Sequence, residues 1–241
     1  MNLYILTGTT KGLGAGLRDQ LQAEAGNLVI CISRAAQQLT APVNIHLDVA
    51  DSAAIEPAFA ACLPLIAGRT FDRAVLINNA AVVAPVGRFD SIGAQDLARS
   101  ISVNLVAPII LAGLFANATR GCAAQRLVVN ISSGLARRAM AGQSAYCSGK
   151  AGLEMATRVA ALEAEDGLAI CSLAPGVIDT PMQAQLRSVS ETQFPDVERF
   201  RGMKADGTLR SAADVARDII GVIQAGKLTN GGIFDIREMT A

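Results

Sequence analysis

A tyrosine and a lysine stand four residues apart in the segment Tyr146-Cys-Ser-Gly-Lys150, inside a stretch with a helical pattern. Residues four apart share one face of an α-helix, so the phenol and the ammonium are expected to be neighbours. A phenol has an ordinary pKa of about 10, and a nearby ammonium stabilises the phenolate and lowers that pKa. The pair therefore predicts a proton transfer by Tyr146 that Lys150 tunes.

A serine lies upstream of this pair, directly after a predicted strand at 127–132. Ser133 would thus stand at the carboxyl edge of a sheet, where the sites of α/β proteins form. Its hydroxyl can hold a substrate carbonyl while Tyr146 donates a proton to the carbonyl oxygen. Arg137 and Arg138 follow on the same loop and are expected to be a solvated pair, with reach to an acidic substrate group as the alternative.

The segment Thr7-Gly-Thr-Thr-Lys-Gly-Leu-Gly14 lies between a predicted strand at 3–7 and a predicted helix at 13–25. Gly8 permits a tight turn, Gly12 lets the backbone approach a pyrophosphate, and Gly14 allows the helix to pack closely on the strand. The phosphates would meet the free amides and the positive end of the helix. A glycine loop in this context predicts dinucleotide binding.

The end of the second predicted strand, Cys31-Ile-Ser-Arg34, distinguishes between the two nicotinamide dinucleotides. It carries no Asp or Glu to bind the ribose 2′-hydroxyl of NAD. Ser33 and Arg34 stand there instead, and a guanidinium offers a planar pair of donors that suits a 2′-phosphate. Lys11 projects from the glycine loop towards the same corner, so the sequence predicts NADP(H).

Short apolar runs alternate with helical patterns along the chain, which predicts an α/β fold with a doubly wound parallel sheet and helices on both faces. Without internal repeats or linkers, residues 1–241 are expected to form a single domain, with a polar substrate lid at 183–210. The other predicted strands are 28–33, 44–48, 74–78, 169–174 and 233–236. The other predicted helices are 53–63, 94–118, 145–165 and 212–225, the last capped by Ser211.

Composition excludes several classes of function. The 21 basic and 21 acidic residues balance, which gives no electrostatic reason to bind nucleic acid. The longest apolar run, 105–116, is shorter than the roughly 20 residues that span a bilayer, so no membrane partner is expected. Five scattered cysteines without CxxC spacing predict reduced thiols and no metal site. With no signal peptide before the first strand, a cytoplasmic location is expected.

Over essentially its whole length the chain resembles the short-chain dehydrogenase/reductase family. Residues 7–14 are similar to that family's TGxxxGxG pattern, and Asn78-Asn-Ala-Ala81 is similar to its NNAG segment, with alanine in place of the glycine. The resemblance implies a single Rossmann domain whose seven strands follow the order 3-2-1-4-5-6-7. It implies a catalytic tetrad of Asn104, Ser133, Tyr146 and Lys150, in which Asn104 supports a proton-relay water. It implies cofactor contacts by Gly8, Thr10, Lys11, Gly12, Leu13, Gly14, Ser33, Arg34, Asp48, Val49, Asn79, Ala80, Tyr146, Lys150, Pro175, Gly176, Val177 and Thr180.

Shorter motifs give a narrower resemblance, to the sepiapterin reductase and bacterial benzil reductase branch. They are SRAAQQL at 33–39, NISSGLA at 130–136, AYCSGKAGLEM at 145–155 and GGIFDIREM at 231–239. In sepiapterin reductases an aspartate near the C-terminus anchors the pterin, and Asp235 falls in the similar segment; the alternative is that it merely ends the last strand. The other predicted substrate residues are Leu135, Met140, Met182 and Phe194.

These observations predict an NADPH-dependent reductase of a ketone or diketone, sepiapterin-like or benzil-like. One alternative is an NADP-dependent alcohol dehydrogenase that uses the same site oxidatively. Another is a non-catalytic NADP-sensing protein, although such proteins typically lack the tyrosine or the lysine that this chain has. The resemblance also implies a homodimer or homotetramer formed through the helices at 94–118 and 145–165.

Overall fold

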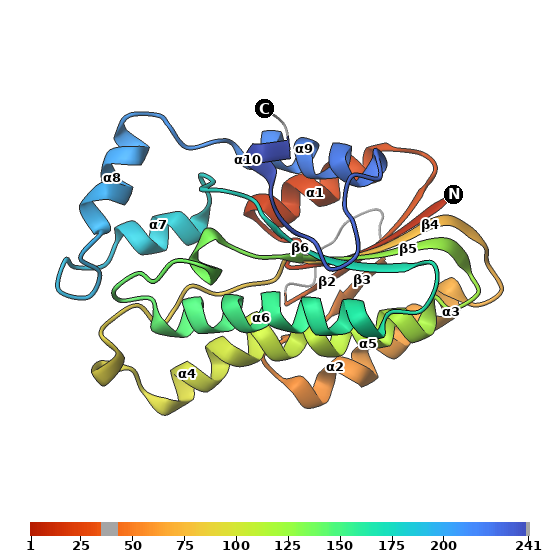
Figure 1. Cartoon of the computed structure of the whole chain (residues 1–241), viewed down its shortest axis with the longest axis horizontal. Coiled ribbons are helices and arrows are strands. Elements are labelled where there is room, and N and C mark those ends of the chain that lie inside the picture. The colour runs from red at the N-terminus through yellow and green to blue at the C-terminus, as the bar shows by residue number, and fades with distance from the viewer. Residues whose placement is uncertain (35–42, 240–241) are drawn as a thin grey trace.

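In the computed structural model, which describes residues 1–34 and 43–239, seven strands form one parallel sheet in the order β3-β2-β1-β4-β5-β6-β7 (Figure 1). The predicted fold class and strand order are therefore confirmed. The predicted domain 1–241 and the motif at 33–39 lie partly outside the described residues. The strands are β1 (Asn2–Thr7), β2 (Asn27–Ser33), β3 (Val43–His46), β4 (Phe71–Asn78), β5 (Ala123–Ile131), β6 (Leu168–Ala174) and β7 (Ile233–Asp235).

Helices bury both faces of the sheet, and successive side chains of each strand enter opposite cores. In β1, Leu3 and Ile5 enter one apolar core, and Tyr4 and Leu6 enter the other. Helices α1 (Gly12–Ala23) and α9 (Ala212–Gln224) cover one face, and α2 (Ser52–Phe59), α5 (Ala107–Ala118) and α6 (Ser144–Glu163) cover the other (Figure 1). The predicted cap is present, since the Ser211 hydroxyl accepts a hydrogen bond from the Asp214 amide at 3.1 Å.

The helix predicted at 94–118 contains an irregularity that its apolar pattern did not indicate. It is made of α4 (Ala94–Ile101), a π-helical turn (Ser102–Val106) and α5. By length and composition alone this 25-residue stretch could cross a membrane, with a mean hydropathy of 1.9 over its most apolar window. The core helix of a soluble protein meets the same criteria. Here α5 packs Leu111 and Phe115 into the apolar core on one face of the sheet.

The segment predicted as a polar lid at 183–210 holds two short helices, α7 (Pro181–Arg187) and α8 (Val197–Ala205), at the end of the molecule where the strands finish (Figure 1). They form because Leu186, Val197 and Phe200 share a third apolar cluster with Tyr146. Two smaller helices, α3 (Leu63–Ile66) and α10 (Ile236–Met239), complete the described chain. β3 ends at His46, two residues earlier than predicted, so Asp48 lies beyond the strand.

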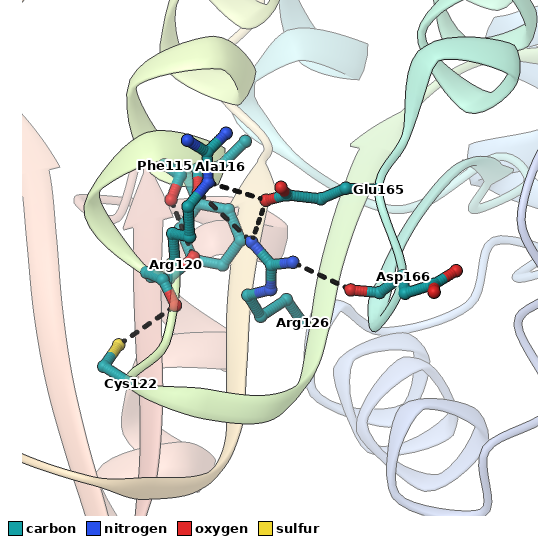
Figure 2. A network of polar contacts seen from close by, with 8 residues as sticks. Phe115, Ala116, Arg120, Cys122, Arg126, Glu165 and Asp166 are labelled. Carbon is teal, nitrogen blue, oxygen red and sulfur yellow. Dashed lines mark hydrogen bonds and ion pairs between the residues drawn. The ribbon is translucent and has the colours of Figure 1, made fainter.

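The buried side chain of Arg126, near the start of β5, links the end of α5 to the segment before β6 (Figure 2). These contacts lie far from the carboxyl ends of the strands. Arg126 donates hydrogen bonds to the carboxylate of Glu165 at 2.8 Å, to the Asp166 carbonyl at 3.0 Å and to the Ala116 carbonyl at 3.3 Å. The positive charge therefore meets the carbonyl end of α5, where a cation is favourable. Arg120, 65% exposed, donates to the same Glu165 carboxylate at 3.1 Å.

Replacing Arg126 with methionine is expected to destabilise the protein by about 2–3 kcal/mol, because the Glu165 carboxylate and the part-buried Ala116 and Asp166 carbonyls lose their partner. Urea unfolding measures the effect. Arg120→Met is the matched control, and its exposed ion pair should leave the unfolding midpoint nearly unchanged. Equal midpoints for the two variants would show that the buried contacts of Arg126 do not matter.

Candidate active site

A cavity of about 970 Å³ opens at the carboxyl ends of the strands. It runs from the glycine loop at 8–14, past Ser133, Tyr146 and Lys150, to the wall made by α7 and α8. Every residue that the sequence predicted to contact the cofactor lines this one cavity. Among the other predicted site residues, Asn104 and Phe194 do not line it.

The glycine loop leaves a bare backbone cradle at one end of the cavity. Gly8 and Gly12 have φ values of 71° and 58°, a region that favours glycine. A Cβ atom on Gly14 would lie 2.1 Å from the Gly8 carbonyl oxygen, so only glycine lets α1 begin this close to β1. The N-cap residue Lys11 makes no side-chain cap, which leaves the positive end of α1 facing the cavity. The cradle fits a pyrophosphate.

The end of β4 is fastened to this loop by hydrogen bonds. The side-chain amide nitrogen of Asn79 donates to the Thr7 and Gly8 carbonyls, each at 3.1 Å. In return the Thr7 hydroxyl accepts from the backbone amides of Asn79 at 3.0 Å and Ala80 at 2.9 Å. The two strand ends therefore form one rigid floor beneath the cavity.

Three cations and one carboxylate line the end of the cavity beyond β2, namely Lys11, Arg34, Arg99 and Asp48. Lys11 and Arg34 line it, and within residues 1–34 and 43–239 neither forms an ion pair. Asp48 is paired instead with Arg99, whose guanidinium donates to it at 2.8 Å. Burial raises the pKa of Asp48, but the hydrogen bonds from Arg99 and the Ala50 amide, together with the charges of Arg99 and Arg34, outweigh it and hold the pKa below its usual range.

Tyr146 and Lys150 lie on one face of α6, as predicted, with the lysine nitrogen 5.9 Å from the centre of the tyrosine ring. The predicted lowering of the Tyr146 pKa is wrong for this structure. Burial raises the pKa of Tyr146 to about 12, and a hydrogen bond with Ser133 opposes the rise only in part. Burial also lowers the pKa of Lys150 to about 8. The lysine ammonium donates to the Ile131 carbonyl at 2.7 Å, which fixes it at the end of β5.

Asn104 lies in the π-helical turn and is fully buried. Its side-chain amide donates to the Val82 carbonyl at 2.8 Å and accepts from the Val82 amide at 3.2 Å, so it holds the chain after β4 in place. The helix α6 approaches this point closely at Gly149, where a Cβ atom would lie 2.9 Å from that of Asn104. The side chain therefore acts as a clamp rather than as a group that faces the cavity.

The predicted substrate residues Leu135, Met140, Met182 and Asp235 line the cavity, but Phe194 is placed elsewhere. Phe194 is 0% exposed and packs behind the wall against Phe200, with ring centres 5.2 Å apart. Phe200 forms the wall in its place. Phe194 was predicted to line the pocket because it is an apolar residue in a polar segment. It is buried instead between α7 and α8, two helices that the sequence pattern did not predict.

Asp235 stands at the end of β7 with a side chain only 7% exposed. Arg237 binds both carboxylate oxygens, at 2.9 Å and 2.6 Å, and holds the pKa of Asp235 below its usual range. The stem of Arg237 lies over Gly176, where a Cβ atom would meet it at 3.2 Å. Asp235 thus both ends the strand and borders the cavity, with its charge neutralised.

Two buried polar residues near the catalytic side chains were missed. Glu154 follows Lys150 by one helical turn and accepts a hydrogen bond from Ser132 at 2.8 Å. Arg137, predicted to be solvated, approaches the same carboxylate at 3.7 Å. Gln143 borders the cavity just before α6, and its buried side-chain amide has no partner among the described residues. The spacing of Glu154 on the Tyr146 face of α6 is the signal that could have found it.

A parallel sheet with a glycine cradle and a Ser-Tyr-Lys group at one edge, its tyrosine and lysine buried, defines a dinucleotide-dependent oxidoreductase of the Rossmann type. The chain belongs to the short-chain dehydrogenase family, whose model matches residues 2–191. Members of this family use a nicotinamide cofactor.

Similar proteins extend this finding along the whole chain. Benzil reductase ((S)-benzoin forming) from Bacillus subtilis (strain 168) is 38% identical over 244 residues, which cover 99% of each chain. Sepiapterin reductase from Xenopus laevis is 30% identical over 254 residues, which cover 97% of this chain and 94% of the relative. A short-chain dehydrogenase/reductase from Saccharomyces cerevisiae shares the fold, with a TM-score of 0.85, 21% identity and coverage of 98% and 96% of the two chains. The resemblance to the benzil and sepiapterin reductase branch is confirmed.

Proposed function

We propose that the protein is an NADPH-dependent reductase that converts a ketone or diketone to an alcohol. The observation that carries the proposal is a single cavity that joins the glycine cradle to Ser133, Tyr146 and Lys150. A dinucleotide on the cradle would extend along the same channel towards the phenol. The curated relatives named for the reduction of benzil and sepiapterin support a carbonyl substrate.

Lys11 and Arg34 support NADPH rather than NADH. Both line the same end of the cavity, and the Asp48 carboxylate there is already paired with Arg99. A 2′-phosphate would meet two cations, whereas the 2′-hydroxyl of NADH would find no free carboxylate to bind it.

Arg34→Asp is expected to lower the preference for NADPH over NADH by about 100-fold, because a charged hydrogen bond is exchanged for a repulsion. The ratio of kcat/KM for the two cofactors measures it. Arg88→Asp, an exposed change outside the cavity lining, is the control and should leave the ratio unchanged. An unchanged ratio in Arg34→Asp would mean that Arg34 does not bind the 2′-phosphate.

The roles of the side chains follow from their positions. A bound reduced nicotinamide supplies a hydride to the carbonyl carbon. The Ser133 hydroxyl donates a hydrogen bond to the carbonyl oxygen, where negative charge develops. Tyr146 donates its proton to that oxygen, and the Lys150 ammonium stabilises the phenolate that remains. Asn104 contributes to this site through its hold on Val82, since its side chain does not line the cavity.

The ionisation of the site favours reduction over oxidation as the direction of the reaction. Burial raises the pKa of Tyr146 to about 12, so at neutral pH the phenol carries the proton that the reduction requires. Alcohol oxidation needs the phenolate as a base, which the same burial disfavours. Matched assays of a ketone with NADPH and its alcohol with NADP⁺ compare the two directions.

The state of Asp235 supports a neutral, benzil-like diketone over a pterin-like substrate. A carboxylate that anchors a pterin must accept hydrogen bonds from it, and Arg237 already donates to both oxygens of Asp235, which leaves less acceptor capacity for a substrate. The remaining wall is largely apolar, with Leu135, Met182 and Phe200. Such a wall suits the rings of an aromatic diketone.

A substrate panel tests the proposed function. NADPH consumption with benzil, sepiapterin and a simple aryl ketone should show the highest kcat/KM for benzil. A preference for sepiapterin would overturn the diketone assignment. Tight NADPH binding without reduction of any carbonyl would overturn the enzyme assignment in favour of an NADP-sensing protein.

We also propose that the protein assembles as a homodimer or homotetramer through α4–α5 and α6. These helices expose large apolar side chains, namely Leu97, Ile109, Met155, Val159 and Leu162. Scattered exposed apolar residues are common, but such residues on two adjacent helices are typical of an interface. Sedimentation equilibrium would show a monomer if this face has no partner.

A further inference from the structure

The buried carboxylate of Glu154 has no part in the proposed proton transfer. It lies on α6 one turn beyond Lys150 and two turns beyond Tyr146, with a side chain only 5% exposed. Its Oε1 accepts a hydrogen bond from the Ser132 hydroxyl at 2.8 Å, and its Oε2 lies 3.7 Å from Nε of Arg137. An apolar side chain would fill this space at a lower desolvation cost, so packing alone does not explain a carboxylate.

The two partners of Glu154 bracket a short turn that carries Ser133. Within that turn the Ser133 hydroxyl accepts from the Leu135 amide at 3.1 Å, and the Ser133 carbonyl accepts from the Ala136 amide at 3.0 Å. The segment 132–137 is thus internally hydrogen-bonded, and the Ser132 amide also donates to the Leu173 carbonyl of β6 at 2.9 Å. One carboxylate on α6 contacts the side chains at both ends of the segment.

We propose that Glu154 is a positioning residue that holds the segment 132–137 so that the Ser133 hydroxyl meets the hydroxyl of Tyr146. The inference rests on the proposed function, because it assigns Glu154 a part in the same reaction. Tyr146 and Glu154 share one helix face, so the helix sets the distance between the proton donor and the anchor of the serine turn. A displacement of about 1 Å in such a site lowers turnover by about 100-fold.

Substitutions can test the contacts of Glu154 with Ser132 and with Arg137 separately. Ser132→Ala removes the hydrogen bond and keeps the charge beside Arg137, while Ser132→Thr keeps a hydroxyl. Glu154→Gln keeps an oxygen acceptor for Ser132 but loses the attraction to Arg137. Glu163→Gln, at an exposed position on the same helix, is the matched control.

The kinetic test measures kcat and KM for benzil, NADPH binding and the melting temperature of each variant. We expect kcat to fall about 10- to 100-fold in Ser132→Ala and Glu154→Gln, with the NADPH dissociation constant within about twofold of wild type. Ser132→Thr should restore most of kcat. A lower melting temperature with unchanged kcat would show a merely structural role and overturn the inference.

A second measurement does not depend on turnover. The chain has two tyrosines, so Tyr4→Phe leaves Tyr146 as the only one. In that background the ¹³Cζ resonance of labelled Tyr146 reports its hydrogen bond with Ser133. The resonance should shift in Ser132→Ala and Glu154→Gln but not in Glu163→Gln. An unshifted resonance would overturn the inference. Because this measurement needs no turnover, it tests the inference separately from the proposed function, which fails if wild type reduces no carbonyl.

Discussion

Replacing Tyr146 with phenylalanine is expected to lower kcat for ketone reduction by about 10³-fold while leaving the NADPH dissociation constant within about twofold. The change removes one oxygen and its proton and keeps the ring that packs with Val83 and Leu186 in the apolar cluster. Steady-state kinetics and a fluorescence titration with NADPH measure the two quantities. The protein should stay folded, because the aromatic packing is retained.

The chain supplies a matched control for this experiment. Tyr4, in β1, is the other tyrosine; it is also buried, but it does not line the cavity. Tyr4→Phe should leave kcat close to that of wild type. If Tyr146→Phe kept more than about a tenth of the activity, the proton would have to come from another group.

Replacing Lys150 with methionine is expected to abolish turnover and, at neutral pH, to stabilise the fold. Burial lowers the pKa of Lys150 from 10.5 to about 8, so its charged form opposes folding. The shift corresponds to about 3 kcal/mol, from which the lost hydrogen bond to the Ile131 carbonyl subtracts, for a net gain of about 1–2 kcal/mol.

The sign of this effect depends on pH. Between about pH 8 and 10.5 the unfolded chain holds the Lys150 proton and the folded chain does not, so wild-type stability rises with pH across that window. The advantage of Lys150→Met is therefore full below about pH 8 and disappears above pH 10.5. Urea unfolding at pH 6.5 and pH 10 measures the difference, with the exposed Lys227→Met as control. A variant less stable than wild type at both pH values would contradict the burial argument.

The fold could be predicted almost completely because its signals are local. Alternating apolar runs and helical periods identify strands and helices, and the loop at 7–14 identifies which edge of the sheet holds the site. The wrong predictions concern side chains whose position depends on tertiary packing. Phe194 and Phe200 are alike in sequence, and only the packing of α8 sends one behind the wall and the other into the cavity.

The catalytic spacing was equally predictable, but the electrostatics were not. The interval between Tyr146 and Lys150 places them on one face, whereas their pKa values depend on how deeply α6 is buried. Glu154 was missed for a related reason. A glutamate on a helix is usually solvated, and only the structure shows that the turn at 132–137 covers it.

The π-helical turn at Ser102–Val106 sets how far α5 is rotated about the helix axis relative to α4. One extra residue in a helix turns everything after it by roughly 100° about the axis. The residues of α4 and α5 consequently cannot share one continuous stripe, so α5 directs Leu111 and Phe115 to the sheet while Asn104 reaches Val82. A one-residue deletion between 102 and 106 would restore a regular helix at the cost of that arrangement. The number of residues in this helix is therefore fixed by the packing on both sides of the turn.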